Sequence, residues 1–399
     1  MTRSIKLWAA ALGVVGLVTY GLLVVGDFLL FMSVSRGGTE ANAEARAIED
    51  QRREEEDGPM EQAAIEAGFE RAQILVGLVD QFYRTRQAAL DADLSVLAIP
   101  KPNEELYLCN EGYGLVRFTS DRFGYRNDDA VWDSEAVDVV LIGDSFGQGA
   151  CVPNEATITA RLGAGRTALD LSTTSNEPIH YAAVAKVFVP ELEPANAVML
   201  FYANDNVPTS RWSSYYKIFF DRDFDSSSYV DRSSGRLEPS ADLVKFNQNI
   251  MKILNQMSLE WRGQAEPPIL ERIMKRYYDA RVFLRLTNIR WMLWNIFGGS
   301  ETPPFTSRLA LETLADQCAI HECRPIVAYI PNSEFWRPDS RGPVYAGQLR
   351  AYSEKLGLRF VDFSSELNRE DYSLKGPHLS PVGYAKVAQG IEGALAPKE

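Results

Sequence analysis

Val137-Asp138-Val139-Val140-Leu141-Ile142-Gly143-Asp144-Ser145-Phe146-Gly147 is an apolar, strand-like segment that runs directly into Gly-Asp-Ser. A hydroxyl placed where a strand breaks into a tight, glycine-rich turn before a helix lies at the carboxyl edge of a sheet. Open α/β folds place their chemistry at that edge. Ser145 is therefore the candidate nucleophile, and we expect the neighbouring Asp144 to stabilise the turn.

From Val137 onward, strand-like and helix-like segments alternate. The predicted strands are 137–142, 167–171, 197–202, 325–330 and 359–363, and the predicted helices are 155–162, 178–192, 307–321, 345–356 and 381–395. Five strands joined by crossover helices form a parallel sheet with helices on both faces. The sequence therefore predicts an α/β fold, a three-layer parallel sheet with a flavodoxin-like strand order.

The alternation stops between Asn206 and Pro304, which predicts an insertion at 206–304 after the third strand. It contains a polar stretch at 221–238 and an aromatic helical one at 281–297, with Trp291 and Trp294. We expect the insertion over the carboxyl edge of the sheet, as a substrate lid, a partner-docking surface or a membrane-facing cap. The Trp-rich segment is alternatively part of a core.

The amino terminus carries an uncharged, mostly apolar run from Leu7 to Gly26, preceded by Arg3 and Lys6. A run of ~20 such residues spans a bilayer, and the basic residues before it place the amino end in the cytoplasm. We expect residues 7–26 to contact inner-membrane lipid and the main domain to be periplasmic or otherwise extracytoplasmic. A cleaved signal peptide is the alternative, although no clear cleavage site follows. Asp27 is predicted to be an interfacial carboxylate rather than a functional group within the membrane.

These features divide the chain into a membrane anchor at 1–36, a stalk with an amphipathic helix at 37–105, and the α/β domain at 106–399. The stretch from 37 to 58 has few large apolar residues and an acidic run at 54–57, which predicts a solvated stalk. Helical spacing of apolar residues predicts a helix over 63–90 that packs on the domain, and glycines within 106–125 predict a β-hairpin.

Composition excludes several function classes. The formal charge of −13 comes without a basic block, which argues against nucleic acid as a partner. The four cysteines are too few for a disulfide framework, and their spacing does not suit a metal site, so no metal or other cofactor is expected. We expect buried free thiols or one bridge between Cys318 and Cys323. A Gly147-x-Gly149 segment imitates a dinucleotide fingerprint, but its first glycine comes too late after the strand.

Two further segments place polar groups where the cleft is expected. Asn204 follows the third strand, and its side-chain amide can donate a hydrogen bond there. His378 lies in a loop before the last helix, for which Ser380 and Pro381 suit the N-cap and first positions.

A Ser, an Asn and a His in these positions resemble the SGNH (GDSL-type) hydrolase family over most of residues 137–396. The match is closest to its bacterial membrane-anchored branch. The motifs that carry it are Gly124-Tyr125-Arg126-Asn127, Gly143 to Gly149, Asn204-Asp205, and His378 to Tyr384. The resemblance implies an SGNH hydrolase fold and acyl chemistry, as an esterase or O-acyltransferase acting on an acylated carbohydrate or a small ester. In that mechanism His378 takes the proton from Ser145, while the amides of Ser145 and Ser175 and the Asn204 side chain hold the oxyanion.

Two positions depart from the family pattern. Ser175 stands where the family usually has a glycine. The family also has an Asp two or three residues before the His, whereas this chain has Lys375 and Gly376. Asp371 is the predicted substitute. If no acid reaches the imidazole, the alternative is a catalytically reduced SGNH scaffold that binds a glycan or an envelope protein partner.

Overall fold

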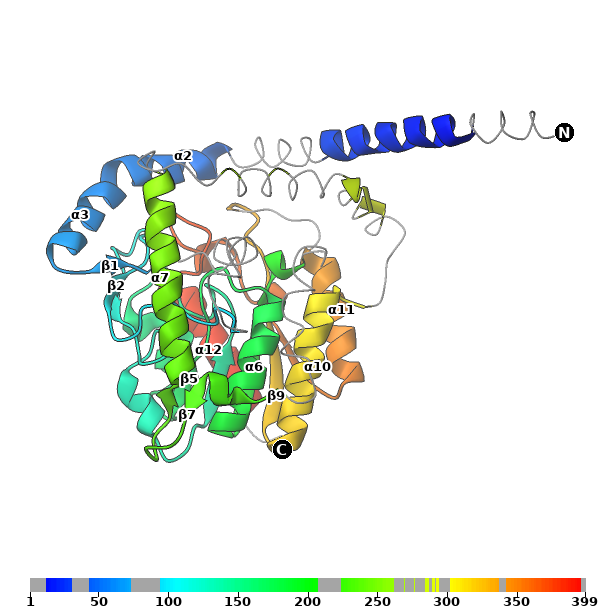
Figure 1. The fold of residues 1–399 in the computed structure, drawn as a ribbon. Helices are drawn as coiled ribbons and strands as arrows, with labels where there is room; N and C mark the ends of the chain where they lie inside the picture. Colours follow the sequence, from blue (N-terminus) through cyan, green and yellow to red (C-terminus); the bar gives the residue numbers. More distant parts are fainter. Residues whose placement is uncertain are drawn as a thin grey trace. The chain divides into compact units, whose positions relative to one another are not determined.

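The computed structural model describes residues 12–30, 43–72, 94–206, 224–261, 302–336 and 342–395, with short pieces between 269 and 293. The chain divides into two compact units. The first comprises residues 1–43 and 266–300, and the second comprises residues 44–265 and 301–399. The second unit holds the α/β sheet (Figure 1). Every predicted site residue also belongs to this unit.

The first unit contains the helix Leu12–Leu30, whose 19 residues have a mean hydropathy of 2.0 and are long and apolar enough to cross a membrane. Asp27 lies inside this helix rather than past its end, because the apolar residues that follow extend the helix to Leu30. Its carboxylate is buried and accepts a hydrogen bond from the amide of Ile289 at 2.6 Å. Residues 266–300 of the insertion group with this helix, while Trp291 and Trp294 lie outside the described residues.

The second unit is built on a five-stranded parallel sheet with the order β10-β9-β6-β4-β5. Its strands are β4 (Val139–Ile142), β5 (Ala168–Asp170), β6 (Asn196–Tyr202), β9 (Arg324–Ile330) and β10 (Arg359–Asp362). In chain order this is the 2-1-3-4-5 arrangement of flavodoxin-like sheets, as predicted. Every residue of β4 and β6 is buried, since helices cover both faces of these central strands.

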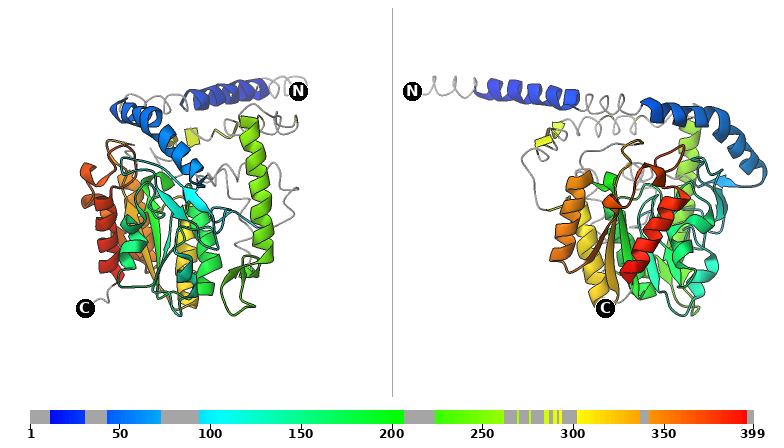
Figure 2. Two further views of the ribbon diagram at one scale, coloured as in Figure 1. Left: turned by 90° about the vertical axis from the view of Figure 1, so that its left-hand side faces the viewer. Right: turned by 180° about the vertical axis from the view of Figure 1, so that it is seen from behind.

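Helices pack on the two faces of this sheet. They are α5 (Ile158–Leu162), α6 (Pro178–Leu192), α10 (Phe305–Ile320), α11 (Gly342–Lys355) and α12 (Pro381–Leu395). The helix α6 packs against α10, and α12 packs against α5 on the opposite face (Figure 2). The bounds of α6 and α12 are the predicted ones, whereas α5 begins three residues later because the short 3-10 helix η4 (Asn154–Ala156) precedes it.

Before the large sheet, the chain forms three consecutive helical segments and a small sheet. The segments are α2 (Ala43–Arg52), the π-helix η1 (Arg53–Asp57) and α3 (Gly58–Glu66). The small sheet has the order β1-β2-β3, with strands β1 (Glu70–Arg71), β2 (Glu105–Tyr107) and β3 (Arg117–Thr119). The antiparallel pair β2–β3 is the predicted hairpin.

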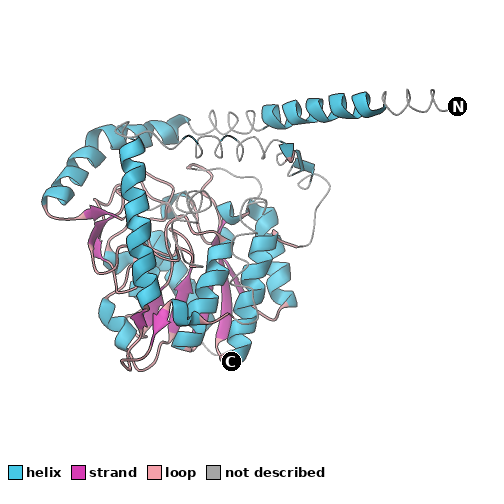
Figure 3. Cartoon of the chain, viewed as in Figure 1, coloured by secondary structure: helices cyan, strands magenta, loops and turns pink. Residues whose placement is uncertain are grey.

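The helix predicted over 63–90 agrees with the structure only at 63–66, the end of α3, and is wrong from there to residue 72. Gly68 has φ +90°, a left-handed conformation that ends α3, and β1 follows directly. Residues 73–93 lie outside the described part of the chain. The remaining described elements (Figure 3) are η3 (Asp129–Asp133), η5 (Ala203–Asp205), η8 (Ser226–Ser228), β7 (Val230–Asp231), β8 (Glu238–Pro239), α7 (Ala241–Trp261), η9 (Phe363–Ser365) and η10 (Arg369–Asp371).

Candidate active site

Ser145 lies in a tight turn that follows β4 at the carboxyl edge of the sheet. Asp144 stabilises the turn as expected, since its carboxylate accepts the amide of Phe146 at 2.9 Å and its carbonyl accepts the amide of Gln148 at 3.0 Å. A side chain at Gly147 would place its Cβ 2.2 Å from the Ser172 hydroxyl. Only glycine therefore lets the turn approach the end of the neighbouring strand β5 so closely.

His378 lies against the candidate nucleophile. Its Nε2 is 2.9 Å from the Ser145 hydroxyl oxygen, although 233 residues separate the two in the sequence. The loop that carries His378 is held by a hydrogen bond from the Ser373 amide to the His378 carbonyl at 2.8 Å. Ser380 caps α12 as predicted, because its hydroxyl accepts the Gly383 amide at 3.1 Å. The predicted contact between Ser145 and His378 is therefore present.

The acid beside the imidazole is Glu111. One oxygen of its carboxylate lies 2.7 Å from Nδ1 of His378, and the other accepts the His378 backbone amide at 3.0 Å. Glu111 is only 4% exposed. Burial alone would raise its pKa, but the charge and hydrogen bonds of His378 and the charge of Arg52 outweigh burial and lower the pKa below the ordinary value. The residue is therefore ionised at neutral pH and orients the ring so that Nε2 faces Ser145.

Asp371 does not take this position, and its prediction as the orienting acid is wrong. Its carboxylate accepts hydrogen bonds from Nζ of Lys386 at 2.7 Å and from the amide of Asn368 at 2.9 Å. The 3-10 helix η10, which Asn368 caps, directs the side chain of Asp371 toward α12. Asp371 is therefore near His378 in the sequence, but its side chain does not contact the imidazole.

Gly376, two residues before His378, leaves the space that the Glu111 side chain occupies. A Cβ atom at Gly376 would lie 2.0 Å from the carboxyl carbon of Glu111. Glu111 thus fills the space that a side chain at 376 would need, and it reaches the imidazole from a different loop. Sequence reasoning missed Glu111, and the unexplained glycine near His378 was the one signal of a carboxylate arriving from elsewhere.

The predicted oxyanion groups lie at the ends of β5 and β6. Ser175 has φ +71°, so it adopts the left-handed conformation that a glycine at this position would favour, and the turn is kept. Among the described residues, no group accepts a hydrogen bond from the backbone amide of Ser145 or Ser175. Asn204 is exposed and lies in η5, directly after β6. Its neighbour Asp205 has a local role, since its carboxylate accepts the Tyr202 amide at 2.9 Å and the Tyr181 hydroxyl at 3.1 Å.

The Gly-Tyr-Arg-Asn segment before the sheet supports the nucleophile turn. The guanidinium of Arg126 is buried and donates to the carbonyls of Gly149 at 2.7 Å and Val152 at 2.8 Å. Burial lowers its pKa to about 10, so it is charged at neutral pH. Asn127 connects the end of β5 to Asp121. Its side-chain nitrogen donates to the backbone carbonyl of Asp170 and to the carboxylate of Asp121, both at 2.8 Å.

Buried carboxyl groups surround the turn. Burial raises the pKa of Asp144 to about 6 and that of Asp170 to about 8. Each accepts a hydrogen bond from the backbone amide two residues later, at 2.9 Å. These acids therefore act on the backbone at the strand ends, whereas Glu111 is the acid in contact with the imidazole.

Both pairs of cysteines form disulfides, Cys318–Cys323 and Cys109–Cys151. The first is one of the predicted options, and the second was not predicted. Donor atoms of Glu111, Cys151 and His378 lie within 4.8 Å of one another, a grouping that resembles a metal site. The Cys151 sulfur is bonded to Cys109, however, so it offers no thiolate to a metal ion.

Residues 43–66 include part of the predicted solvated stalk, and some of them contact the site loops. Arg52 donates to the carbonyl of Lys375 at 2.5 Å, and the Lys375 ammonium pairs with Glu56. The side-chain amide of Asn110, next to Glu111, donates to Glu56 at 3.2 Å. The acidic run is therefore only partly solvated, because a cation and an amide from the site loops bind its end. Glu56, which makes two of these contacts, lies in the π-helix η1, an irregularity often found at functional sites.

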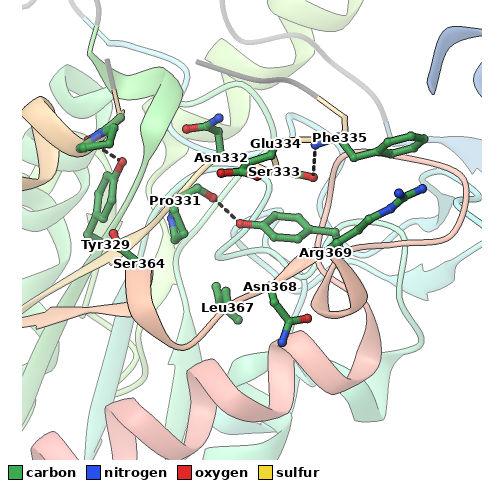
Figure 4. A pocket seen from close by; sticks show the side chains of 13 residues that line it. Tyr329, Pro331, Asn332, Ser333, Glu334, Phe335, Ser364, Leu367, Asn368 and Arg369 are labelled. Atoms are coloured by element: carbon green, nitrogen blue, oxygen red, sulfur yellow. Dashed lines mark hydrogen bonds between the residues drawn. The ribbon is translucent and has the colours of Figure 1, made fainter. Parts of the chain in front are cut away.

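A cavity of about 940 Å³ opens beyond the carboxyl end of β9. Figure 4 shows Phe335 and Arg369 at its margin, and the Arg369 guanidinium lies 3.9 Å from the centre of the Phe335 ring. The cavity adjoins the His378 loop, since Tyr372 lines it and pairs with Leu379 in a β-bridge. A cavity of this size can hold a ligand of several hundred Å³. It lies at the same edge of the sheet as Ser145.

No protein-family model matches this chain, and no curated protein matches it. Solved structures similar to it include the crystal structure of TesA, with 10% sequence identity and a TM-score of 0.35. The similarity covers 65% of this chain and 98% of the TesA chain.

Proposed function

We propose that this chain is a membrane-anchored, extracytoplasmic serine esterase or O-acyltransferase with an SGNH-type fold. The observation that carries the proposal is the continuous contact from Ser145 through His378 to Glu111, at 2.9 and 2.7 Å. A hydroxyl, an imidazole and a carboxylate in this order are the parts of a nucleophilic triad, which is recognised by geometry and not by sequence position.

The first half of the reaction forms an acyl-enzyme. Nε2 of His378 removes the proton from the Ser145 hydroxyl as its oxygen attacks the ester carbonyl. The backbone amides of Ser145 and Ser175, together with the Asn204 side chain, hold the negative oxygen of the tetrahedral intermediate. The imidazolium then gives its proton to the leaving alcohol, while the Glu111 carboxylate stabilises the ring's positive charge.

The second half returns the enzyme to its starting state. His378 removes a proton from water or from a sugar hydroxyl as that oxygen attacks the acyl carbonyl. The bond from the acyl carbon to the Ser145 oxygen then breaks, and the imidazolium returns the proton to that oxygen. Water gives an esterase, and a sugar hydroxyl gives an O-acyltransferase. The cavity beside the His378 loop supports a substrate larger than a simple ester, and an acylated glycan fits its polar and aromatic lining.

The location rests on two observations. The helix Leu12–Leu30 is long and apolar enough to cross a membrane, and the basic residues Arg3 and Lys6 before it favour a cytoplasmic amino end. Two disulfides in the α/β unit favour an oxidising compartment, such as a bacterial periplasm. A cleaved signal sequence is the remaining alternative for that helix, and it would leave the main domain in the same compartment.

The noncatalytic alternative, a scaffold that binds a glycan or an envelope partner, rested on the missing Asp near His378. Glu111 supplies a carboxylate at the same ring nitrogen, so that support is gone. An enzyme is therefore the function that the site supports best.

The experiment is turnover of a small chromogenic acyl ester by the purified full chain in detergent, with and without an oligosaccharide acceptor. We expect release of the alcohol in both cases, and acyl transfer to the acceptor if the protein is a transferase. No release above the uncatalysed rate, and no acylated protein by intact mass, would contradict the proposal.

A further inference from the structure

The disulfide between Cys109 and Cys151 joins the two loops that carry the outer members of the triad. Cys109 lies two residues before Glu111, and Cys151 lies in the turn that follows Ser145. The Cys151 sulfur is also 3.7 Å from Nδ1 of His378, the ring nitrogen that Glu111 contacts. We propose that this disulfide is a positioning element that holds Glu111 against His378, so that the proposed acyl chemistry, on which this inference rests, depends on its oxidised state.

Glu111 needs such a link because it comes from a different sheet. Ser145 follows a strand of the five-stranded sheet, whereas Glu111 lies in the loop between β2 and β3 of the small three-stranded sheet. No described strand pairing connects the two sheets. The loop contains no regular strand between 108 and 116, and its Gly112 has φ +101°. The disulfide is thus the covalent connection between the acid's loop and the nucleophile's turn.

The Cys151 end of the link is firmly held. The Arg126 guanidinium donates to the carbonyls of Gly149 and Val152, which flank Cys151 on either side. Cys151 itself has φ +60°, a backbone conformation that few residues adopt unless their surroundings impose it. A cysteine fixed in this way can define the position of Cys109, and through it the position of Glu111.

The Glu111 loop also makes hydrogen bonds within itself and to other segments. The Cys109 carbonyl accepts the Val116 amide at 3.1 Å, the Glu111 carbonyl accepts the Lys375 amide at 3.2 Å, and the Asn110 side chain donates to Glu56 at 3.2 Å. Among the described residues, none of these hydrogen bonds reaches the turn that carries Ser145, so the disulfide is what fixes the loop relative to that turn. Loss of the disulfide is therefore expected to move Glu111 away from the ring while the rest of the fold persists.

The chemistry of the switch is a two-electron exchange. A dithiol such as dithiothreitol attacks the Cys109–Cys151 bond through its thiolate, forms a mixed disulfide, and then closes to its own cyclic disulfide. The two cysteine sulfurs gain two electrons and two protons, and the dithiol loses the same number. Reoxidation by a disulfide oxidant reverses the exchange.

The chain offers a matched control. Cys318 and Cys323 join the end of α10 to the start of β9, with only five residues of separation. The start of a parallel strand lies at the opposite edge of the sheet from the carboxyl ends, where Ser145 lies. Removing this second disulfide changes the same chemical groups without touching the triad.

The test compares Cys109→Ser/Cys151→Ser with Cys318→Ser/Cys323→Ser, each in the wild-type and the Glu111→Gln backgrounds. We expect the first pair of substitutions to lower kcat by about 10²-fold or more in the wild-type background and to have almost no further effect in the Glu111→Gln background. The control pair should change kcat less than about threefold in both backgrounds. Equal losses in both backgrounds, or full activity without the disulfide, would overturn the inference.

A spectroscopic measurement keeps the inference testable without turnover. The proton on His378 Nδ1, shared with a carboxylate, gives a downfield resonance in the ¹H NMR spectrum. We expect this resonance in the wild type and the control variant, and its loss in Cys109→Ser/Cys151→Ser and on reversible reduction of the wild type. A resonance that survives the loss of the disulfide would overturn the inference.

An inactive wild-type protein whose resonance depends on the disulfide would instead contradict the proposed function alone. If Cys109→Ser/Cys151→Ser does not fold, the reduction experiment on the wild type decides.

Discussion

Ser145→Ala and His378→Ala are each expected to lower kcat on a small acyl ester by on the order of 10⁴-fold to 10⁶-fold. The Ser145 hydroxyl and the His378 ring lie 2.9 Å apart and act as one unit, because the oxygen is a weak nucleophile until the imidazole takes its proton. The double variant should therefore be no slower than either single one. The measurement is steady-state turnover with unfolding midpoints recorded for every variant.

His321→Ala is the matched control for the histidine. His321 lies at the end of α10, where its ring is 3.7 Å from Glu193, and it takes no part in the site. Its replacement should leave kcat within about twofold. A His378→Ala variant with near-normal turnover would remove the imidazole from the mechanism, and multiplicative losses in the double variant would show that the two residues act separately.

Glu111→Gln is expected to lower kcat by up to about 10⁴-fold, since related losses of the acid in a triad are of that size. The amide keeps the volume of the carboxylate but not its charge, so the imidazolium loses its stabilising partner and the ring loses its fixed tautomer. Asp371→Asn, which alters the acid that lies near His378 only in the sequence, should leave kcat almost unchanged. A larger loss in Asp371→Asn than in Glu111→Gln would contradict the geometry.

The space at Gly376 sharpens this prediction. A Cβ at position 376 would collide with the Glu111 side chain. The three atoms nearest to that Cβ all belong to Glu111. In Glu111→Ala the three atoms nearest to that Cβ are removed or displaced, so adding Gly376→Asp should recover part of the lost turnover by supplying an acid two residues before His378. Gly376→Asp in the wild-type background should instead lower kcat. If the double variant folds but shows no recovery of turnover, an acid at position 376 cannot replace Glu111.

The features that local sequence determines were predicted well. The apolar run before Gly143 and the alternation that follows it predict the parallel sheet, and Pro178 and Pro381 mark the starts of α6 and α12 where the structure has them. The meeting of Ser145 and His378 also followed, because the carboxyl ends of parallel strands share one edge of the sheet. Each of these inferences needs only a periodicity, a turn residue or a topological rule.

The features that depend on long-range contacts were not predicted. Glu111 is 267 residues from His378 and lies in a loop between two strands of the small sheet, and nothing in its neighbourhood marks it as different from other acidic residues. Asp371 was the closer acid in the sequence, but η10 turns it toward Lys386. The Cys109–Cys151 bridge was missed for the same reason, since its partners are 42 residues apart and lie in loops that follow strands of two different sheets.

Covalent trapping can show whether Ser145 is a nucleophile that His378 and Glu111 activate. The full chain is treated with a fluorophosphonate probe, digested, and the labelled peptide is identified by mass spectrometry. We expect a single adduct on Ser145, formed much more slowly in Glu111→Gln and absent in Ser145→Ala. A probe that leaves Ser145 unmodified in the folded wild-type protein, or that labels another serine equally well, would contradict it.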